Sequence, residues 1–429
     1  MNSHENSFSL FWMMWAGQLL SKIGSGISAF ALGVYLLQET GSTSAYSSLL
    51  IAAFLPSVLL APAGGVMADR KDRRLMMAAG DIGSAAGICF VILMFLLNPN
   101  RHWPIYLGVG FSSVFAALQS PAFKASVTDI LDESVYAKAS GLIQLAEASK
   151  FFIAPFIAGF LLTRFSIPAV LGVDVATFLL AALSVILIRK RMAVPPKEST
   201  EKDFQKSFTE GIRYLVGNDP VRRLLWLTIG ITFLTGFLQS LFVPIVLSFT
   251  DTVTLGAVQS VSAFGMLAGS LMVGIYSKSD AARQVLSISL AAAGLFYTMI
   301  GATPHLLTIT VTAFCFFFTL PFVNSSLEVL FRRNIANDMQ GRTWSLISLI
   351  SQSGMVIAVG SAGPLADCFF NPLLTETGGL SKTVGSLIGT GASRGSGLMV
   401  MIAGLLLLTY ALLNVKAEKK PNTITDLFV

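Results

Sequence analysis

The sequence predicts an all-α integral membrane protein whose twelve transmembrane helices form two six-helix halves related by pseudo-symmetry. Of its 429 residues, 54% are hydrophobic and 12% are charged, and the mean hydropathy is +0.71. Soluble proteins carry about 25% charged residues, so this chain lacks the polar surface that covers a water-soluble core. Twelve long apolar runs and an internal repeat support the same prediction.

The apolar runs are each long enough to cross a bilayer, which takes about 20 residues. They cover roughly 10–37, 45–68, 75–97, 103–125, 138–164, 167–188, 222–249, 255–277, 284–302, 305–331, 341–368 and 396–415. All are expected to be helices, because backbone polar groups in hydrocarbon must be satisfied within their own segment. The N-terminus has no basic region typical of a cleaved signal peptide, so the first run is expected to stay as an anchor.

The basic residues predict the orientation. The loops that alternate on one side hold 23 of the 29 lysines and arginines; they are 70–74, 124–138, 189–223, 278–283, 332–342 and the C-terminal tail. Loops rich in basic residues face the cytoplasm. We therefore expect both termini to be cytoplasmic in a bacterial-type cytoplasmic membrane. The net charge of +6 then reflects topology rather than nucleic-acid binding.

The longest of these loops divides the chain. We predict an N-terminal half at 1–190, a cytoplasmic linker at 191–221 and a C-terminal half at 222–429. Apolar residues recur at helical spacing in the linker at Phe204, Phe208, Ile212 and Leu215. This spacing predicts an amphipathic helix on the inner membrane surface, with a solvated linker as the alternative.

An internal repeat relates the halves. "AKASGLIQLAEASKFFIAPFIAG" (137–159) aligns with "GRTWSLISLISQSGMVIAVGSAG" (341–363) at a shift of 204 residues. Eight residues are identical, including Gly159 with Gly363, and Lys138 meets Arg342 at the cytoplasmic edge. Parallel repeats of this kind are typical of transporters, whose substrate site lies between the halves near the midplane.

The stretch "GGVMADRKDRR" (64–74) has six charged residues at six consecutive positions, 69–74, between two apolar runs. A carboxylate at Asp69 would be stabilised by the positive end of span eleven, near Gly341. Small residues at 64 and 65 would let the helices approach closely enough. The arginines can pair with nearby acids. We predict a polar latch on the inner side that opens during transport; its residues are Gly65, Asp69, Arg70, Arg73 and Arg74.

This pattern resembles the loop 2–3 signature of the major facilitator superfamily, with Asp72 at a position where that family usually has glycine. The resemblance implies the major facilitator fold. Span five is similar to the antiporter motif of the same family at Gly141, Ala154, Pro155, Ala158 and Gly159, with Lys150 as a departure. The resemblance implies a drug:proton antiporter that exports its substrate, in which small residues pack helices five and eight tightly and proline bends helix five.

Longer stretches of the sequence indicate a particular branch of this family. "FWMMWAGQLLSKIGSGI", "DPVRRLLWL", "SAFGMLAGSLMVG" and "GRTWSLIS" are similar to the macrolide-efflux-like branch of the family. The segment "FFNPLLTETGGLSKTVGSLIGTGASRGSG" is similar to branch members found beside genes for peptide-antibiotic synthesis. Within this segment Leu380, Val384, Leu387 and Ile388 predict a short amphipathic helix against the outer membrane surface.

Ionisable residues inside spans are costly and are functional candidates by default. The candidates for proton coupling are Glu147, Asp174, Glu328 and Asp81. Glu147 and Lys150 share one face of span five, so a change in their separation could switch the charge of Glu147. The alternatives are that Glu147 and Lys150 only neutralise each other, that Asp174 pairs with Arg164, and that Asp81 and Glu328 support the latch.

The predicted substrate cavity combines charged, amide and aromatic side chains. Its candidates are Gln18, Lys22, Phe111, Phe115, Gln119, Lys150, Phe233, Phe237, Gln239, Phe314, Asn324 and Gln352. Lys22, Glu147 and Lys150 give a net charge of +1 when all are ionised. A neutral or amphipathic substrate therefore fits at least as well as a cation.

The remaining motifs exclude other classes. The chain has no G-x-x-x-x-G-K-[ST] or H-E-x-x-H pattern, so we expect neither ATP-driven transport nor an enzyme. Its three histidines lie outside the spans or, for His305, at the end of one, and its three cysteines imply no disulfide framework. We expect a monomer in membrane lipid, without metal or cofactor, that exports a hydrophobic or amphipathic small molecule in exchange for protons. The substrate would be an antibiotic or peptide natural product; the alternative is a lipid or lysolipid flippase, or an uptake carrier.

Overall fold

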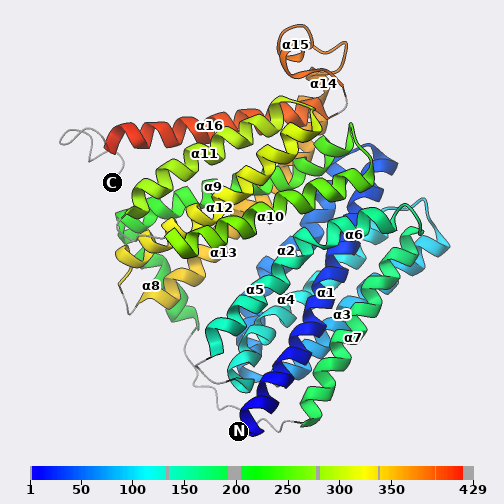
Figure 1. Cartoon of the computed structure of the whole chain (residues 1–429), viewed down its shortest axis with the longest axis vertical. Helices are drawn as coiled ribbons and strands as arrows, with labels where there is room; N and C mark the ends of the chain where they lie inside the picture. The colour runs from blue at the N-terminus through cyan, green and yellow to red at the C-terminus, as the bar shows by residue number, and fades with distance from the viewer. Residues whose placement is uncertain are drawn as a thin grey trace. The chain divides into compact units, whose positions relative to one another are not determined.

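The computed structural model describes residues 2–131, 135–191, 204–276, 281–336, 339–391 and 393–418, and regular structure in these ranges is helical (Figure 1). The first half of the chain holds α1 Asn2–Thr40, α2 Thr43–Arg70, α3 Arg73–Leu97, α4 Trp103–Ile130, α5 Tyr136–Phe152, α6 Ala154–Leu161 and α7 Ile167–Arg191. The remainder holds α8 Phe204–Gly217, α9 Asp219–Leu247, α10 Thr252–Tyr276, α11 Ala282–Ala302, α12 Leu306–Asn334, α13 Gln340–Leu365, the π-helix Ala366–Phe370, α14 Asn371–Leu373, α15 Val384–Ile388 and α16 Arg394–Glu418.

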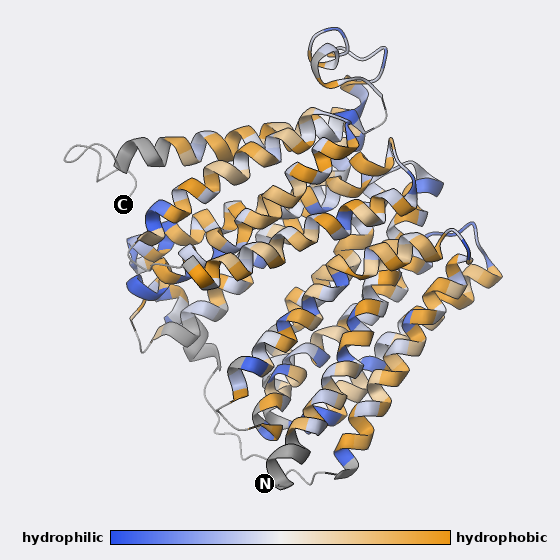
Figure 2. Cartoon of the chain, in the orientation of Figure 1, coloured by the Kyte–Doolittle hydropathy of each residue, from blue (hydrophilic) through white to orange (hydrophobic). Residues whose placement is uncertain are grey.

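Twelve spans are long and apolar enough to cross a membrane in the part of the chain that the structure describes, which confirms the predicted number. Apolar residues cover most of their length (Figure 2). The fifth span is divided into α5 and α6 at Ile153, two residues before Pro155. Proline lacks an N–H and its ring clashes with the preceding turn, so it interrupts the helix where the sequence predicted a bend.

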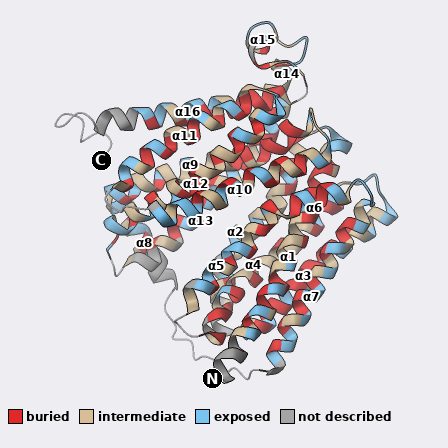
Figure 3. Cartoon of the chain, in the orientation of Figure 1, coloured by how far each residue is buried: buried red, intermediate tan, exposed pale blue. Residues whose placement is uncertain are grey.

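The outward surfaces of these helices are apolar as well. Leu59, Leu96, Leu271 and Ile275 are among many large aliphatic side chains that are exposed in the isolated chain. Exposed and buried positions alternate along each helix (Figure 3). A soluble monomer rarely exposes so much contiguous apolar surface, so the pattern fits helices that face lipid.

Backbone contacts divide the chain into two compact units. The first contains Met1–Gly41, Ser48–Thr200 and Thr252–Ser260; the second contains Ser42–Ser47, Glu201–Asp251 and Val261–Val429. The start of α2 therefore has its contacts in the second unit, and the start of α10 has its contacts in the first. The predicted limits of the two halves and the linker stay a prediction.

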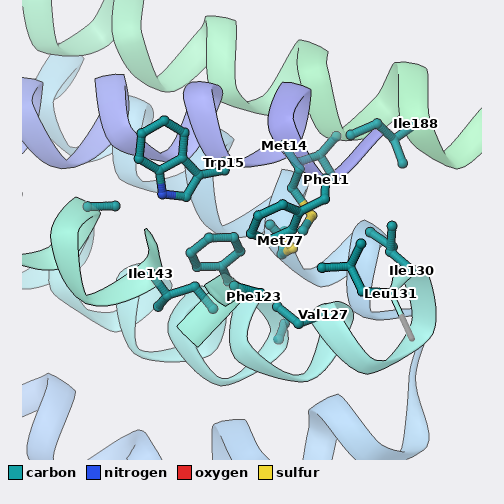
Figure 4. Close-up of a cluster of buried hydrophobic side chains, with 14 of the residues drawn as sticks. Phe11, Met14, Trp15, Met77, Phe123, Val127, Ile130, Leu131, Ile143 and Ile188 are labelled. Carbon is teal, nitrogen blue, oxygen red and sulfur yellow. The ribbon is translucent and has the colours of Figure 1, made fainter. Parts of the chain in front are cut away.

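In the first unit, α1 packs on α5, α6 and α7, and α3 packs on α4 and α7. One of its cores is built by Phe11, Met14 and Trp15 of α1 against Met77 of α3 and Phe123 of α4 (Figure 4). The Trp15 indole N–H also donates to the Leu142 carbonyl oxygen at 2.6 Å. This contact fixes α1 against α5, which matters because both helices carry charged residues.

The second unit repeats this arrangement six spans later. There α9 packs on α13 and α16, and α11 packs on α12 and α16. Each of these pairs corresponds to a pair of the first unit, with α9 in the place of α1 and α13 in the place of α5 and α6. The predicted pseudo-symmetry of the fold is therefore confirmed.

The sequence predicted two short amphipathic helices, one in the linker and one before the last span. The linker region contains the helix α8, in which Leu215 is buried and Ile212 is exposed. The side chains of Phe204 and Phe208 lie outside the described residues. Between α14 and α16, the described helical residues are the five of α15. The apolar residues Leu380, Val384 and Ile388 pack with Leu374 and Leu398 of the protein itself, and the Leu387 side chain is outside the described set.

Candidate functional site

A cluster of opposite charges joins α1 to α5 in the first unit. The Lys22 Nζ of α1 lies 2.9 Å from Glu147 Oε1, and the Lys150 Nζ of α5 lies 3.6 Å from Glu147 Oε2. The two partners on α5 are three residues apart and so share one helix face. The ion pair between Glu147 and Lys150 is present, and Glu147 also pairs with a second ammonium group from a different helix.

The charge of this cluster is positive. Two lysines contact one carboxylate, so one positive charge is in excess among these three side chains when all are ionised. We call Lys22, Glu147 and Lys150 the lysine cluster.

The depth and exposure of the cluster decide what surrounds it. Lys22 is near the centre of the span Phe8–Thr40, and Glu147 and Lys150 lie within Lys138–Leu161. The side chains of Lys22, Glu147 and Lys150 remain 15%, 25% and 33% exposed in the isolated chain. Charges that face hydrocarbon at this depth are costly, so the surface that carries them requires water, protein or a bound polar group.

Asp81 of α3 forms a separate polar cluster behind Lys22. Its carboxylate is only 1% exposed and accepts hydrogen bonds from Gln18 Nε2 and Gln119 Nε2 at 3.0 Å each, and from Ser21 Oγ at 3.4 Å. Gln119 also donates to Gln18 Oε1. Both amides are buried and satisfy the buried carboxylate, and the assignment of Gln18 and Gln119 to the substrate cavity stays a prediction.

The other candidate carboxylates differ in environment. Asp174 of α7 is buried against α1, beside Gly24, Ser25 and Ser28. The alternative in which Asp174 pairs with Arg164 is wrong, because Arg164 is exposed and lies 5.4 Å over the ring of Phe160. Glu328, near the end of α12, is exposed and forms a 2.6 Å ion pair with Arg332 one turn later.

The aromatic candidates stack in pairs within each unit. The rings of Phe111 and Phe115 of α4 are 5.0 Å apart, as are those of Phe233 and Phe237 of α9. Phe111 is exposed, whereas Phe237 is buried and so packs in the core rather than lining an open cavity. Among the other candidates Asn324 and Gln352 are exposed, and Gln239 and Phe314 are half-buried.

The latch residues are described only in part. The side chains of Asp69 and Arg70 and the first residues of α13 lie outside the described side chains, so the predicted cap on span eleven stays a prediction. Arg73 pairs with Asp129 at 2.8 Å, as expected for an arginine near acids. Gly64 approaches α4, where an added Cβ would lie 2.7 Å from the Ala117 oxygen, whereas Gly65 has no described atom within 4 Å of such a Cβ.

Asp72, the departure from the family signature, begins α3. Its side chain accepts hydrogen bonds from the backbone N–H groups of Arg74 and Leu75, and from Arg189 Nε at 2.7 Å. Aspartate is among the preferred residues for this position because it satisfies N–H groups that have no partner in the helix. Asp72 therefore caps α3 at the position where the family signature usually has glycine, a flexible turn residue.

The small residues of span five permit close packing. A Cβ on Gly159 would lie 2.9 Å from the Thr252 oxygen, and one on Gly256 would overlap the Pro155 oxygen. Ala154 packs in turn against Gly26 of α1. The expected tight packing of spans five and eight is thus present within the first unit, while Gly141 borders open space.

The sequence analysis missed Asp367. This carboxylate accepts hydrogen bonds from Ser42 Oγ at 2.7 Å and from the backbone N–H groups of Thr43 and Ser44 at 3.1 and 2.8 Å. All four residues belong to the second unit. A carboxylate at the positive end of α2 is stabilised by the helix dipole. The run "GSTS" (41–44) carries the signature of a helix start, but nothing in the sequence names its distant partner.

Comparison with known proteins decides the family. The model of the "Major Facilitator Superfamily" matches residues 14–359. The chain belongs to the major facilitator superfamily. It is thus a multi-pass membrane transporter and not an enzyme. The crystal structure of the nucleoside transporter NupG superposes on this major facilitator chain with a TM-score of 0.71 at 13% identity, over 97% of the present chain and 100% of the other.

Relatives of this major facilitator protein include efflux proteins. Macrolide efflux protein A of Streptococcus pyogenes is 26% identical over 372 residues, which are 86% of this chain and 92% of the relative. The protein of the same name from Enterococcus faecalis is 25% identical over 73% of this chain and 98% of its own length. Lysophospholipid transporter LplT of Cronobacter sakazakii is 26% identical over 80% of this chain and 85% of its own length.

Proposed function

We propose that this transporter is a secondary active exporter of a hydrophobic or amphipathic small molecule, such as an antibiotic or a peptide natural product. Transport is by alternating access and is coupled to protons in antiport. The efflux relatives support transport out of the cell. The antiporter-like small residues of span five support antiport, because they pack closely on α10, where Gly159 meets Thr252 and Pro155 meets Gly256.

One observation carries the proposal: a charged cluster lies at mid-depth of two spans and is partly exposed. Lys22 and Lys150 each lie within ion-pair distance of Glu147, and none of the three side chains is fully buried. A purely structural pair is expected to be enclosed by protein, whereas a transport pathway must admit water and substrate to this depth. The cluster supports a pathway along the surface shared by α1 and α5.

Glu147 is the first candidate for proton coupling. It holds ammonium groups from two helices, so its protonation would weaken the link between α1 and α5. Binding a proton at this carboxylate would therefore change both charge and packing in the pathway. Asp81, Asp174 and Glu328 are the further candidates.

The latch at Gly65, Asp69, Arg70, Arg73 and Arg74 is proposed to control the inner side. Asp69→Asn is expected to reduce efflux while folding and expression stay near wild type, because the amide loses a charge–dipole interaction of about 0.3–1 kcal/mol. Efflux rates in vesicles, normalised to the amount of folded protein, test this. Wild-type efflux by the variant would remove the latch from the mechanism.

The transporter is proposed to act as a monomer in the bacterial cytoplasmic membrane, with both termini in the cytoplasm. A second function is favoured by one specific relative, because a lysophospholipid transporter matches most of the chain. A lipid or lysolipid flippase is therefore the runner-up, and an uptake carrier of the same fold is the other alternative.

The experiment that tests the function has two stages. A pump-deficient host that expresses the chain is first tested for susceptibility to macrolides, peptide antibiotics and cationic dyes. The compound that is excluded is then followed in proteoliposomes with an imposed pH gradient. Movement of the compound against its own concentration gradient supports a proton-coupled exporter. Resistance without gradient-driven transport would contradict proton coupling, and lysolipid translocation without drug transport would support the flippase.

A further inference from the structure

We infer that the lysine cluster is a binding subsite for an anionic group, a carboxylate or a phosphate, on an amphipathic substrate. This inference rests on the proposed function as a carrier of amphipathic molecules and specifies the class of molecule. It differs from the expectation, drawn from the sequence, that a neutral substrate fits as well.

The first argument is the number of charges. Lys22 and Lys150 both contact Glu147. One carboxylate cannot neutralise two ammonium groups. The nearby Asp81 is enclosed by Gln18, Ser21 and Gln119 and forms no ion pair among the described residues. A positive excess at mid-depth of a membrane span is costly, and a bound anion removes that cost.

The second argument is the geometry of the ammonium groups. Lys22 and Lys150 belong to different helices, yet they contact the two separate oxygens of one carboxylate, at 2.9 and 3.6 Å. Glu147 thus shows the arrangement that a second carboxylate or a phosphate would adopt. A lysine offers three donors on a flexible stem, so each ammonium can bind Glu147 and another anion together.

The third argument is the apolar surface beside the charge. The Lys150 ammonium lies 4.9 Å from the centroid of the Phe151 ring, and this ring is about half exposed. A substrate with an anionic end and an apolar body would meet matching chemistry at this surface. A cation would be repelled by the lysines.

Binding of matched amphiphiles tests the subsite without any ion gradient. The protein is placed in nanodiscs of zwitterionic lipid, and affinity is measured for two pairs of ligands. One pair is an N-acyl dipeptide and its methyl ester; the other is a lysophosphatidic acid and the monoacylglycerol with the same chain. The anionic member is expected to bind at least about tenfold more tightly in its pair, which corresponds to about 1.4 kcal/mol. The pair with the larger ratio identifies a peptide carboxylate or a lipid phosphate as the source.

Substitutions in the lysine cluster are expected to change the anionic-to-neutral affinity ratio in opposite directions. Lys22→Gln and Lys150→Gln are expected to lower the anionic-to-neutral affinity ratio several-fold, and Lys22→Arg is expected to keep it. Glu147→Gln is expected to raise the ratio, because it removes the carboxylate that competes for both ammonium groups. Lys382→Gln, an exposed lysine elsewhere in the chain, is the matched control and leaves the ratio unchanged.

Equal affinity for the anionic and neutral members, or preference for an alkylammonium of the same chain length, would overturn the subsite. So would a lower ratio in Glu147→Gln, since a purely structural ion pair fails when either partner is removed. The readout is independent of the proposed function: a protein that binds the anion but does not use a pH gradient contradicts only the proton coupling. A protein that moves a neutral drug under a gradient without anion preference contradicts only the subsite.

Discussion

Gly159 and Gly363, which the internal repeat places in register, each lie against the start of another helix. A Cβ on Gly159 would lie 2.9 Å from the oxygen of Thr252, the first residue of α10. A Cβ on Gly363 would lie 2.6 Å from the Cα of Ser44, in the first turn of α2. Each contact is internal to one unit. The repeat thus preserves a specific backbone approach as well as a pattern of residues.

The packing of α6 on the start of α10 can be tested at Gly256. A methyl group at this position would overlap the Pro155 oxygen, so Gly256→Ala must push the two backbones apart. Overpacking of this kind costs about 1–3 kcal/mol. We expect a lower melting temperature and slower efflux, measured in detergent and in proteoliposomes.

Gly274→Ala is the matched control on the same helix, because no described atom lies within 4 Å of the added Cβ. Both substitutions raise helix propensity by a similar amount, about 1 kcal/mol, so their difference reports the steric contact. Equal melting temperatures and efflux rates for the two variants would show that the approach of α6 and α10 has no energetic consequence.

The cap of α3 predicts a pH-dependent stability. Partial burial of Asp72 acts to raise its pKa, but the hydrogen bond from Arg189 and those from the Leu75 and Arg74 N–H groups outweigh it, so the pKa lies below its usual value. The stabilisation is therefore complete above the unfolded-state pKa, about 3.9, and is lost as the pH falls through the lower folded-state pKa.

Asp72→Asn should lower the melting temperature more at pH 7 than near pH 3, because the stabilisation by the charge declines once the pH falls below the unfolded-state pKa. Asp72→Ala should cost more at neutral pH, by about 0.5–2 kcal/mol, because it also removes the helix cap. Melting curves of the purified protein at both pH values provide the measurement. A constant difference between Asp72→Asn and wild type at both pH values would exclude a role for the charge.

Much of the fold could be predicted because membrane spans are local features. Length and hydropathy locate each helix, and Pro155 predicts an interruption where α5 meets α6. The ion pair between Glu147 and Lys150 follows from helical spacing alone. These predictions need only the rise of a helix and the chemistry of neighbouring residues.

Contacts between distant helices could not be predicted in the same way. Gln18, Asp81 and Gln119 come from three helices, and their hydrogen bonds depend on how those helices are rotated about their axes. The sequence therefore did not show that these amides satisfy a buried carboxylate. Asp367 and Ser42 are 325 residues apart. Only the folded structure shows that Asp367 caps α2, which begins directly after Ser42.

Efflux from proteoliposomes by Glu147→Gln tests the central claim of proton-coupled transport through the lysine cluster most directly. The neutral side chain keeps its size but cannot exchange a proton or pair ionically with Lys22 and Lys150. Substrate movement is measured with and without an imposed pH gradient, with the exposed Glu376→Gln as the matched control. We predict that Glu147→Gln loses accumulation against the substrate gradient but keeps binding and downhill exchange, and that Glu376→Gln retains all three. Accumulation by Glu147→Gln at the wild-type level would contradict the account and transfer the coupling role to Asp81, Asp174 or Glu328.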